Sequence, residues 1–317
     1  IDLHRPYVDD IILVSASGKP MKRELDLIDV WFDSGSMPYA QLHYPFENKE
    51  MIDSGKAFPA DFIAEGVDQT RGWFYTLHAI GTTVFDSIAY KNVMSNGLVL
   101  DKNGQKMSKR LGNAIDPFET LQKYGPDATR WYMISNANPW ENLKFDLEGI
   151  DEVRRKFFGT LYNTYSFFSL YANVDGFSYS EKEVENRPEI DRWILSELNS
   201  LIKNVDMCYA DYEPTKAGRL INDFVNDNLS NWYVRLCRKR FWGTGYTEDK
   251  LAAYQTLYVC LETVAKLMAP IAPFYADKLY MDLIATTGRD HVASVHLADF
   301  PVCDETVIDK ELETRME

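Results

Sequence analysis

The sequence lacks paired cysteines. Its 317 residues include four cysteines, and none lies within three positions of another. A CxxC metal-binding pair is therefore excluded, and no zinc site is predicted. Thiols spaced this widely are typical of reduced cysteines in a cytoplasmic protein. The four are Cys208, Cys237, Cys260 and Cys303.

A membrane-spanning segment is also missing. The most apolar stretch, residues 257–274, contains Glu262, Lys266 and two prolines, whereas a spanning helix needs about 20 mostly apolar residues. The chain begins at Ile1 without a signal peptide, and residues 311–317 have a helical pattern without a capping residue. We therefore expect both ends to lie inside a longer, cytoplasmic protein with no membrane partner.

Positive charge is scarce. Lys and Arg number 34 against 48 Asp and Glu, which gives a net charge of −14. A protein that wraps nucleic acid over its whole surface is basic, so any such contact must come from a local basic patch. Aromatic residues make up 14% of the chain, which predicts large cores, and the length predicts two or three domains.

The first hundred residues alternate short β-rich runs with one helical segment. Alternation of this kind predicts an α/β sheet, and because helices are few, we expect half of a doubly wound domain. Strands are predicted at residues 11–14, 28–32, 60–64, 92–95 and 98–100, a helix over 72–85, and a turn at Asn103-Gly104.

After residue 114 the sequence is typical of helices. Asp116 is an N-cap residue, with Pro117 and Glu119 in the first turn, and Asp127 is predicted to cap the next helix. The polar stretch 175–188 is the predicted domain boundary. Apolar stripes beyond it predict an antiparallel helix bundle. One stripe consists of Leu220, Phe224, Leu229, Trp232 and Leu236.

Residues 106–110 read Lys-Met-Ser-Lys-Arg and follow the predicted turn. Ammonium groups on such a loop can stabilise the charge that develops on pyrophosphate when an adenylyl group is transferred, and lysine suits this because it is a compact charge on a flexible stem. Most basic clusters are solvated surface loops. The strand–turn–loop–helix setting favours the phosphate-binding interpretation.

This KMSKR string resembles the KMSKS signature loop of the class I aminoacyl-tRNA synthetases, with Arg110 in place of the final serine. Residues 65–74 (EGVDQTRGWF) and 29–36 (DVWFDSGS) resemble the isoleucyl branch of that class, as do residues 231–242 (NWYVRLCRKRFW). The resemblance covers nearly the whole chain.

The resemblance implies a fold that is α/β plus all-α. Residues 1–114 would form the C-terminal part of a class I, Rossmann-like nucleotide-binding domain, beginning with the return from an editing insertion. Residues 115–185 would form a helical stem-contact region, and residues 186–317 a truncated anticodon-binding helix bundle. The editing domain itself would lie upstream of Ile1.

The resemblance also implies roles for individual residues. Lys109 would contact the ATP phosphates with help from Lys106. Trp31 and Trp73 look like walls of the amino-acid pocket, since two indoles can enclose an aliphatic side chain; plain core aromatics are the alternative. The residues implied to bind ATP or the adenylate are Glu65, Gly66, Asp68, Gln69, Gly97, Met107 and Ser108.

The basic and aromatic segment 232–242 is the predicted nucleic-acid contact. Its cations would meet phosphates and its aromatic rings would stack on unpaired bases. Alternatively, the aromatics are core and the cations are solvated, and the helical spacing favours Trp232 and Leu236 as core. The expected tRNA contacts are Arg235, Arg238, Lys239, Arg240 and Trp242.

The implied reaction is the activation of L-isoleucine by ATP, with Mg²⁺, and its transfer to tRNA(Ile), in a monomeric parent protein. The other half of the class I ATP site, a His-x-Gly-His motif, is absent, so this chain alone is predicted to be inactive. Two alternatives stay open: a valyl or leucyl synthetase of the same class, or a non-catalytic tRNA-binding scaffold.

Overall fold

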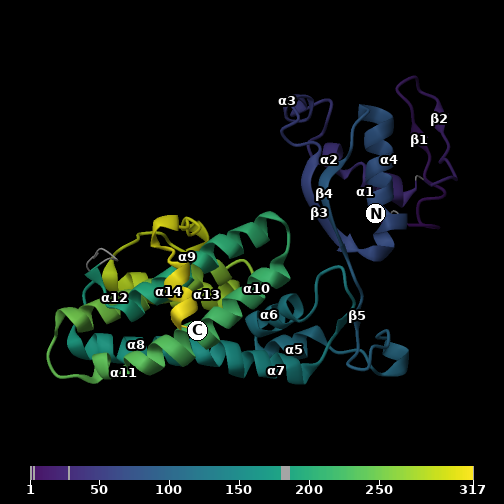
Figure 1. Ribbon diagram of the computed structural model, residues 1–317. Helices are drawn as coiled ribbons and strands as arrows, with labels where there is room; N and C mark the ends of the chain where they lie inside the picture. The colour runs from purple at the N-terminus through teal and green to yellow at the C-terminus, as the bar shows by residue number, and fades with distance from the viewer. Residues whose placement is uncertain (1, 3, 28, 180–185, 317) are drawn as a thin grey trace. The chain divides into compact units, whose positions relative to one another are not determined.

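In the computed structural model, residues 2, 4–27, 29–179 and 186–316 are described. The chain divides into two compact units, Ile1–Asn96 and Gly97–Glu317 (Figure 1). Each unit is described separately below. No helix among the described residues is long and apolar enough to cross a membrane.

A β–α–β segment forms the centre of the first unit. Strand β3 (Ala60–Gly66) pairs in parallel with β4 (Tyr90–Asn96), and the short turn η1 (Val67–Arg71) and helix α4 (Trp73–Phe85) connect them. The predicted strands at 60–64 and 92–95 and the predicted helix are confirmed. The buried core of this unit consists of Tyr39, Ile52, Phe58, Ile63, Phe74, Leu77 and Ala89.

The strand predicted over residues 28–32 is wrong, because Val30–Gly35 forms helix α1. The carboxylate of Asp29 accepts a hydrogen bond from the Trp31 N–H at 3.0 Å. A polar cap of this kind satisfies one of the free donors of the first helical turn, and it outweighs the β preference of the apolar residues that follow. Residue 28 lies outside the described residues. The next helices are α2 (Met37–Ala40) and α3 (Lys49–Asp53).

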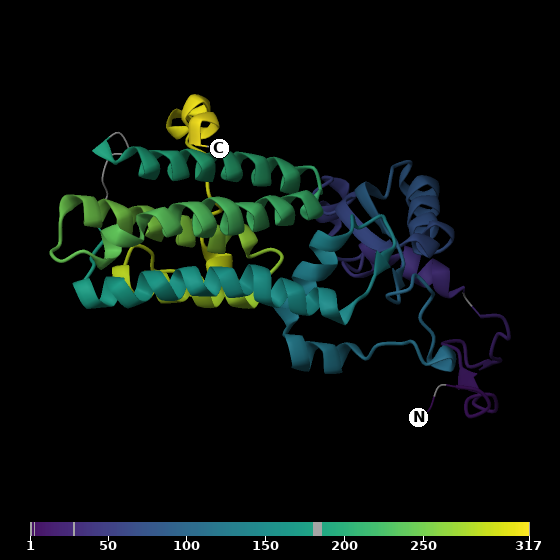
Figure 2. The same ribbon diagram turned by 60° about the horizontal axis from the view of Figure 1, so that its bottom comes forward.

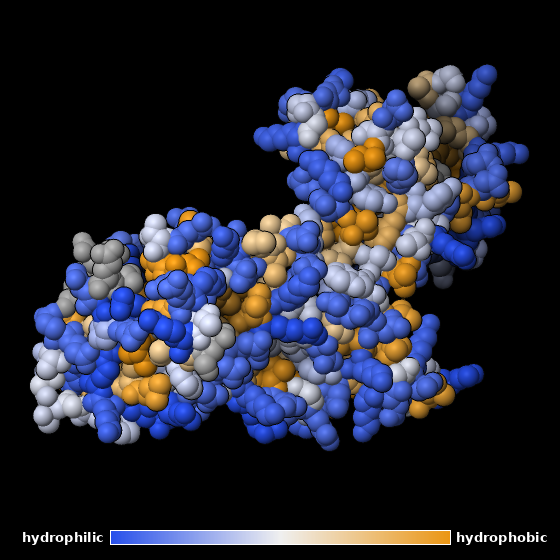
Figure 3. Space-filling view, viewed as in Figure 1, coloured by the Kyte–Doolittle hydropathy of each residue, from blue (hydrophilic) through white to orange (hydrophobic). Residues whose placement is uncertain are grey.

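A short ribbon precedes α1. Strand β1 (Leu13–Val14) pairs antiparallel with β2 (Pro20–Met21), so the strand predicted at residues 11–14 is only half as long. Ile12, Leu13 and Val14 are more than 60% exposed, and orange apolar side chains are visible on the surface of this unit in Figure 3. The small core of the unit therefore leaves the ribbon uncovered.

The second unit begins with a parallel pair of strands, β5 (Val99–Leu100) and β6 (Leu143–Lys144). Between them come the turn η2 (Lys109–Leu111) and helices α5 (Pro117–Tyr124) and α6 (Pro126–Asn136). The predicted cap of α5 is confirmed, since the Asp116 carboxylate accepts hydrogen bonds from the Phe118 and Glu119 N–H groups at 2.7 and 3.3 Å.

Asp127 does not cap its own helix, so that prediction is wrong. Its carboxylate accepts a 2.5 Å hydrogen bond from the N–H of Tyr275 and a 3.5 Å bond from Phe274, in the first turn of α13 (Pro273–Thr287). Burial raises the pKa of Asp127, and these donors partly offset that rise. A local sequence pattern cannot reveal a cap given to a helix 147 residues away.

The remainder of this unit is a bundle whose long helices lie roughly side by side (Figure 2), so the predicted bundle is confirmed. Its helices are α7 (Leu147–Val153), α8 (Gly159–Asp175), α9 (Glu189–Ala210), α10 (Pro214–Asp223), α11 (Arg235–Trp242), α12 (Glu248–Met268) and α13. Two π-helical segments, η3 (Arg154–Phe158) and η5 (Phe224–Val234), continue α7 into α8 and α10 into α11. Shorter elements follow at η6 (Val295–Leu297), η7 (Glu305–Val307) and α14 (Lys310–Met316).

The π-helical segment η5 changes which side chains face the core. Leu236, predicted to be core, is 50% exposed, whereas Cys237 and Phe241 are each 1% exposed. Bonds from i to i+5 place more residues in each turn than an α-helix has, so a stripe counted at the α-helical period drifts off the buried face. Trp232 is partly buried and packs against the core, as predicted.

Helix α6 is joined to the bundle by hydrogen bonds from side chains to backbone carbonyls. Arg130 Nε donates to the Ile271 carbonyl at 2.8 Å, and Arg219 Nε donates to the Ser135 carbonyl at 2.9 Å. The hydroxyl of Thr215, which is buried, donates to the Ile134 carbonyl at 2.7 Å. These bonds satisfy carbonyls that helix ends leave unpaired, and they fix α6 against α10 and the segment before α13.

Candidate functional site

The carboxyl end of β3 carries the predicted acidic residues of the first unit. Glu65 and Gly66 are the last residues of the strand, paired with Ser95 and Asn96 of β4, and Glu65 is exposed. A Cβ on Gly66 would come within 2.7 Å of an Asp68 carboxylate oxygen. Gly66 therefore leaves the space that this carboxylate occupies.

Gln69 links the turn η1 to helix α4. Its side-chain oxygen accepts a hydrogen bond from the Trp73 N–H at 2.9 Å, which satisfies a free donor of the first turn. Its amide nitrogen lies 3.4 Å from the Asp68 carboxylate. The side chains of Asp68 and Gln69 therefore both lie beside the first turn of α4.

The two predicted pocket tryptophans come from neighbouring helices. Trp31 belongs to α1 and Trp73 begins α4, and the indole N–H of Trp73 donates to the Ser34 carbonyl of α1 at 3.0 Å. Trp31 is 42% exposed and Trp73 is partly buried. Neither ring is a fully buried core side chain, so each has surface that a ligand can contact.

Gly97 opens the second unit and approaches another backbone closely. Its N–H donates to the Pro139 carbonyl at 2.8 Å, and a Cβ there would lie 2.2 Å from the Glu141 carbonyl oxygen. The structure thus gives Gly97 a packing reason to lack a side chain. Its implied contact with adenosine stays a prediction.

The KMSKR loop is built on a small hydrogen-bonded scaffold. The Asn113 side chain accepts from the Ser108 N–H and donates to the Asp101 carboxylate and the Lys106 carbonyl, at 2.9, 2.9 and 3.2 Å. The Asn113 hydrogen bond lowers the pKa of Asp101. Gly104, with φ +82°, makes the preceding turn. Asn113 and Asp101 were not among the predicted site residues.

This scaffold leaves the cationic side chains of the loop exposed to solvent. Lys106, Lys109 and Arg110 are exposed, and none forms an ion pair with another residue in the part of the chain that the structure describes. Met107 packs against the core of the unit, and Ser108 caps η2 by accepting from the Arg110 N–H at 3.1 Å. The loop therefore presents three unneutralised positive charges from a fixed base.

The predicted ATP-site residues divide between the two compact units. Trp31 and the segment 65–73 belong to the first, and Gly97 and the loop 106–110 belong to the second. Each cluster is formed by its own unit.

In helix α11, three predicted tRNA-binding cations point to solvent and one does not. Arg235, Arg238 and Lys239 are exposed, and Trp242 is 54% exposed. The side chain of Arg240 is only 15% exposed and is engaged inside the protein. The structure therefore places Arg240 in a different environment from the one predicted.

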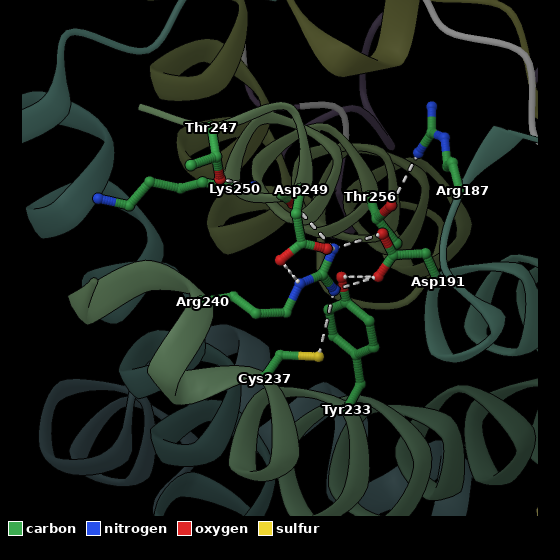
Figure 4. Close-up of polar contacts among 9 residues, drawn as sticks. All are labelled: Arg187, Asp191, Tyr233, Cys237, Arg240, Thr247, Asp249, Lys250 and Thr256. Atoms are coloured by element: carbon green, nitrogen blue, oxygen red, sulfur yellow. Dashed lines mark hydrogen bonds and ion pairs between the residues drawn. The ribbon is translucent and has the colours of Figure 1, made fainter. Parts of the chain in front are cut away.

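The guanidinium of Arg240 pairs with a fully buried carboxylate (Figure 4). Its two terminal nitrogens donate to the two oxygens of Asp191 at 2.6 and 2.9 Å, and its Nε donates to Asp249 at 2.9 Å. The Tyr233 hydroxyl donates to Asp191 at 2.8 Å. Burial, followed by the Asp191 charge, raises the pKa of Tyr233 well above 10, which keeps its hydroxyl protonated.

Lys250 and Thr247 stabilise the turn that joins α11 to α12. Lys250, which is buried, donates to the Gly243 carbonyl at 2.9 Å and pairs with Asp175 at 2.5 Å, and Thr247 caps α12. Asp191 lies 49 residues from Arg240 in sequence. Sequence reasoning missed this network because charges this far apart give no local signal.

Family comparisons match two separate segments of the chain. Residues 2–146 match the family described as tRNA synthetases class I (I, L, M and V). Residues 191–317 match the family described as anticodon-binding domain of tRNA ligase.

Curated relatives match the chain over nearly its whole length. Isoleucine–tRNA ligase of Bacteroides fragilis is 77% identical over 319 residues, which is 100% of this chain and 28% of that protein. The enzymes of Cytophaga hutchinsonii and Clostridium novyi are 70% and 50% identical, over 99% and 100% of this chain and 28% and 30% of their own lengths. The chain thus spans less than a third of these relatives.

Two solved structures share the fold. A leucyl synthetase of Agrobacterium radiobacter K84, in a ternary complex with tRNA and LeuAMS, has a TM-score of 0.69 at 20% identity, over 94% of this chain and 36% of that one. Methionyl-tRNA synthetase of Mycobacterium tuberculosis, in complex with methionyl-adenylate, has a TM-score of 0.66 at 20% identity, over 85% and 56%.

Proposed function

Residues 2–146 belong to the class I tRNA synthetases and residues 191–317 to the anticodon-binding domains of tRNA ligases, and from this premise we propose that the chain is part of an isoleucine–tRNA ligase. In the reaction the isoleucine carboxylate attacks the α-phosphate of ATP to give isoleucyl-adenylate and pyrophosphate, and the acyl group then passes to the terminal ribose of tRNA(Ile) with release of AMP. The observation that carries the proposal is the 77% identity over the whole chain.

In this proposal the KMSKR loop acts on the ATP phosphates. Lys109, with Lys106, stabilises the negative charge that grows on the leaving pyrophosphate. The fixed base formed by Asp101 and Asn113 supports this role, since cations held in place before the reaction need no rearrangement during it. Met107 anchors the loop in the core, and Ser108 lies beside the phosphates.

The first unit would hold the amino acid and the adenylate. Glu65 and Asp68 offer carboxylates to the ammonium group and ribose hydroxyls, and the Gln69 amide completes the polar edge. Trp31 and Trp73 offer apolar walls to the isoleucine side chain. Gly66 makes room for the Asp68 carboxylate, whereas Gly97, which we assign to the adenosine, belongs to the second unit.

Magnesium is not assigned to any residue. Among the described residues, no group of three or more His, Cys, Asp or Glu side chains is placed to hold a metal ion. Mg²⁺ is usually held by substrate phosphates together with one or two carboxylates rather than by a protein cage, so in this proposal the ion enters with ATP.

The wider assignments belong to the same proposal. We divide the chain by role into a catalytic part, residues 1–114, a stem-contact part, residues 115–185, and an anticodon-binding part, residues 186–317. The complete protein would act as a monomer in the cytoplasm.

The test is amino-acid-dependent pyrophosphate exchange, measured on the protein expressed from its full reading frame. Exchange with isoleucine well above leucine is expected, and Lys109→Ala should lower kcat by at least about 100-fold, the usual loss when one transition-state donor is removed. A clear preference for valine or leucine would refute the isoleucine assignment. No exchange with any amino acid would favour a tRNA-binding scaffold.

The chain by itself is expected to give no exchange. Contacts to the transition state must come from both halves of the ATP site, and this chain has no His-x-Gly-His motif. Exchange catalysed by residues 1–317 alone would contradict this expectation.

The tRNA contact is tested by salt dependence. If Lys239 meets a phosphate, Lys239→Gln should reduce the slope of log K against log salt by about one for tRNA(Ile). Lys216→Gln is the matched control, because Lys216 is similarly exposed on α10 but pairs with Glu213. Equal slopes for the unsubstituted protein and Lys239→Gln would place the contact elsewhere.

A further inference from the structure

Helices α1 and α4 touch through two glycines, one on each side of the contact. A Cβ on Gly35 of α1 would lie 3.0 Å from Thr76 and 2.9 Å from Ile80 of α4. A Cβ on Gly72, just before α4, would lie 2.9 and 3.1 Å from two ring carbons of Trp31 in α1. Both glycines are buried.

The two contacts bear directly on the proposed amino-acid pocket. Gly72 faces the six-membered ring of Trp31 and is bonded to Trp73. On the opposite side, Gly35 follows Ser34, whose carbonyl accepts the indole N–H of Trp73. Gly72 therefore contacts the Trp31 indole directly, and Gly35 adjoins the carbonyl that binds the Trp73 indole.

The first turn of α4 has little freedom to absorb an added atom. A Cβ on Gly72 would also lie 2.8 Å from the Gln69 side-chain oxygen. That oxygen already accepts the Trp73 N–H. An added methyl group must displace the Trp31 ring, the Gln69 amide, or both.

We propose that Gly35 and Gly72 are positioning residues that set the spacing of Trp31 and Trp73, and thereby determine how well the pocket separates isoleucine from valine. This inference rests on the proposed function of the site. Indole rings are rigid, so a displaced ring moves as a whole and the pocket changes width. The methylene by which isoleucine exceeds valine is the group that loses contact first.

The experiment compares kcat/KM for isoleucine and valine in pyrophosphate exchange, on the protein from its full reading frame. Gly72→Ala and Gly35→Ala are each expected to lower the isoleucine/valine ratio by about fourfold, which is the factor that burial of one methylene contributes. A variant that is merely less stable loses activity with both amino acids, and its ratio does not change.

Gly81→Ala is the matched control. Gly81 lies in the same helix, and its Cβ would meet Phe58 and Ala89 at 3.3 Å, on core residues rather than on Trp31. This variant should be less stable and keep the ratio of the unsubstituted protein. An equal shift of the ratio in Gly81→Ala would overturn the inference.

A second variant tests the contact itself. Trp31→Phe removes the two ring carbons that a Cβ on residue 72 would meet, so adding Gly72→Ala to it should change the ratio less than Gly72→Ala does alone, because only the contact with the Gln69 oxygen remains. Independent, additive effects would overturn the proposed contact. Unchanged ratios in both glycine variants would overturn this inference alone, whereas absence of isoleucine-dependent exchange in the unsubstituted protein would overturn the proposed function as well.

Discussion

Arg240 shows that a basic residue in a basic segment need not face a ligand. Its neighbours Arg238 and Lys239 are exposed, but its own guanidinium forms an ion pair with the Asp191 carboxylate, which is fully buried. Arginine suits this position because its planar fork binds both oxygens of Asp191 at once. The pair fixes the end of α11 against α9, and so orients the exposed cations that precede it.

Arg240→Gln is predicted to destabilise the second unit by about 3–5 kcal/mol, because it leaves the Asp191 carboxylate buried without its cation, with the Tyr233 hydroxyl still donating to it. The midpoint of urea unfolding, monitored by circular dichroism, measures this change. Lys239→Gln, one residue earlier and exposed, should change the free energy of unfolding by less than about 0.5 kcal/mol. Similar midpoints for the two variants would contradict the role of the pair.

Asp175 gives the protein an acid-sensitive contact. Hydrogen bonds from Lys250 and then Tyr254 lower the pKa of Asp175 below its ordinary 3.8. A carboxyl whose folded-state pKa is depressed stabilises the protein fully above the ordinary pKa, and this contribution is lost as the pH falls below that value.

Asp175→Asn is therefore predicted to lower stability at pH 7 and to weaken the dependence of stability on pH below about 4. Urea unfolding of both proteins between pH 3 and 7 measures this. Parallel pH profiles for the two proteins would show that Asp175 does not contribute to the acid response.

At the scale of elements, the π-helical segment η5 decides the packing of the helix that follows it. Counting at the α-helical period selects Leu236, and the structure buries Phe241. Phe241 packs edge-on against Phe167 and Tyr254, with ring centroids 5.1 Å apart in each case. The extra residues per turn thus rotate α11 so that one face enters the core and the basic face stays in water.

Phe241→Ala should cost about 3–5 kcal/mol, as expected for loss of a buried aromatic side chain. Leu236→Ala removes an apolar side chain of comparable kind from a half-exposed position, and it should cost much less. Guanidinium chloride midpoints of the two variants provide the comparison. A larger loss for Leu236→Ala would mean that the helix packs at the α-helical register.

At the scale of the whole molecule, the two units differ in how much core they possess. The buried cluster of the first unit has seven described members. The cluster of the second extends from Ala128 to Leu312 and includes α12, where Leu257, Leu261 and Val264 have no exposed surface. Since buried apolar area is the main stabilising contribution, the units should differ in stability.

The first unit is predicted to open at lower denaturant concentration than the second. Hydrogen exchange read by mass spectrometry, in urea from 0 to 4 M, should show amides of β3 and α4 exchanging before those of α12. Loss of protection in both units at one urea concentration would instead indicate a single cooperative structure.

The sequence by itself determined those features that depend on neighbouring residues. The Asp116 cap, the strands at 60–64 and 92–95, the helix from Trp73 and the helical bundle all follow from local caps and periodicity. The KMSKR and EGVDQTRGW strings also indicated the family, because a signature sequence is itself local.

Only the tertiary structure decided which side chains have partners far away in the sequence. Asp127 caps a helix far along the chain, Arg240 is paired with Asp191, and Gly72 makes room for Trp31. The physical reason is common to all three. A hydrogen bond, an ion pair or a close contact depends on distance in space, and residues brought together by folding leave no pattern in the sequence between them.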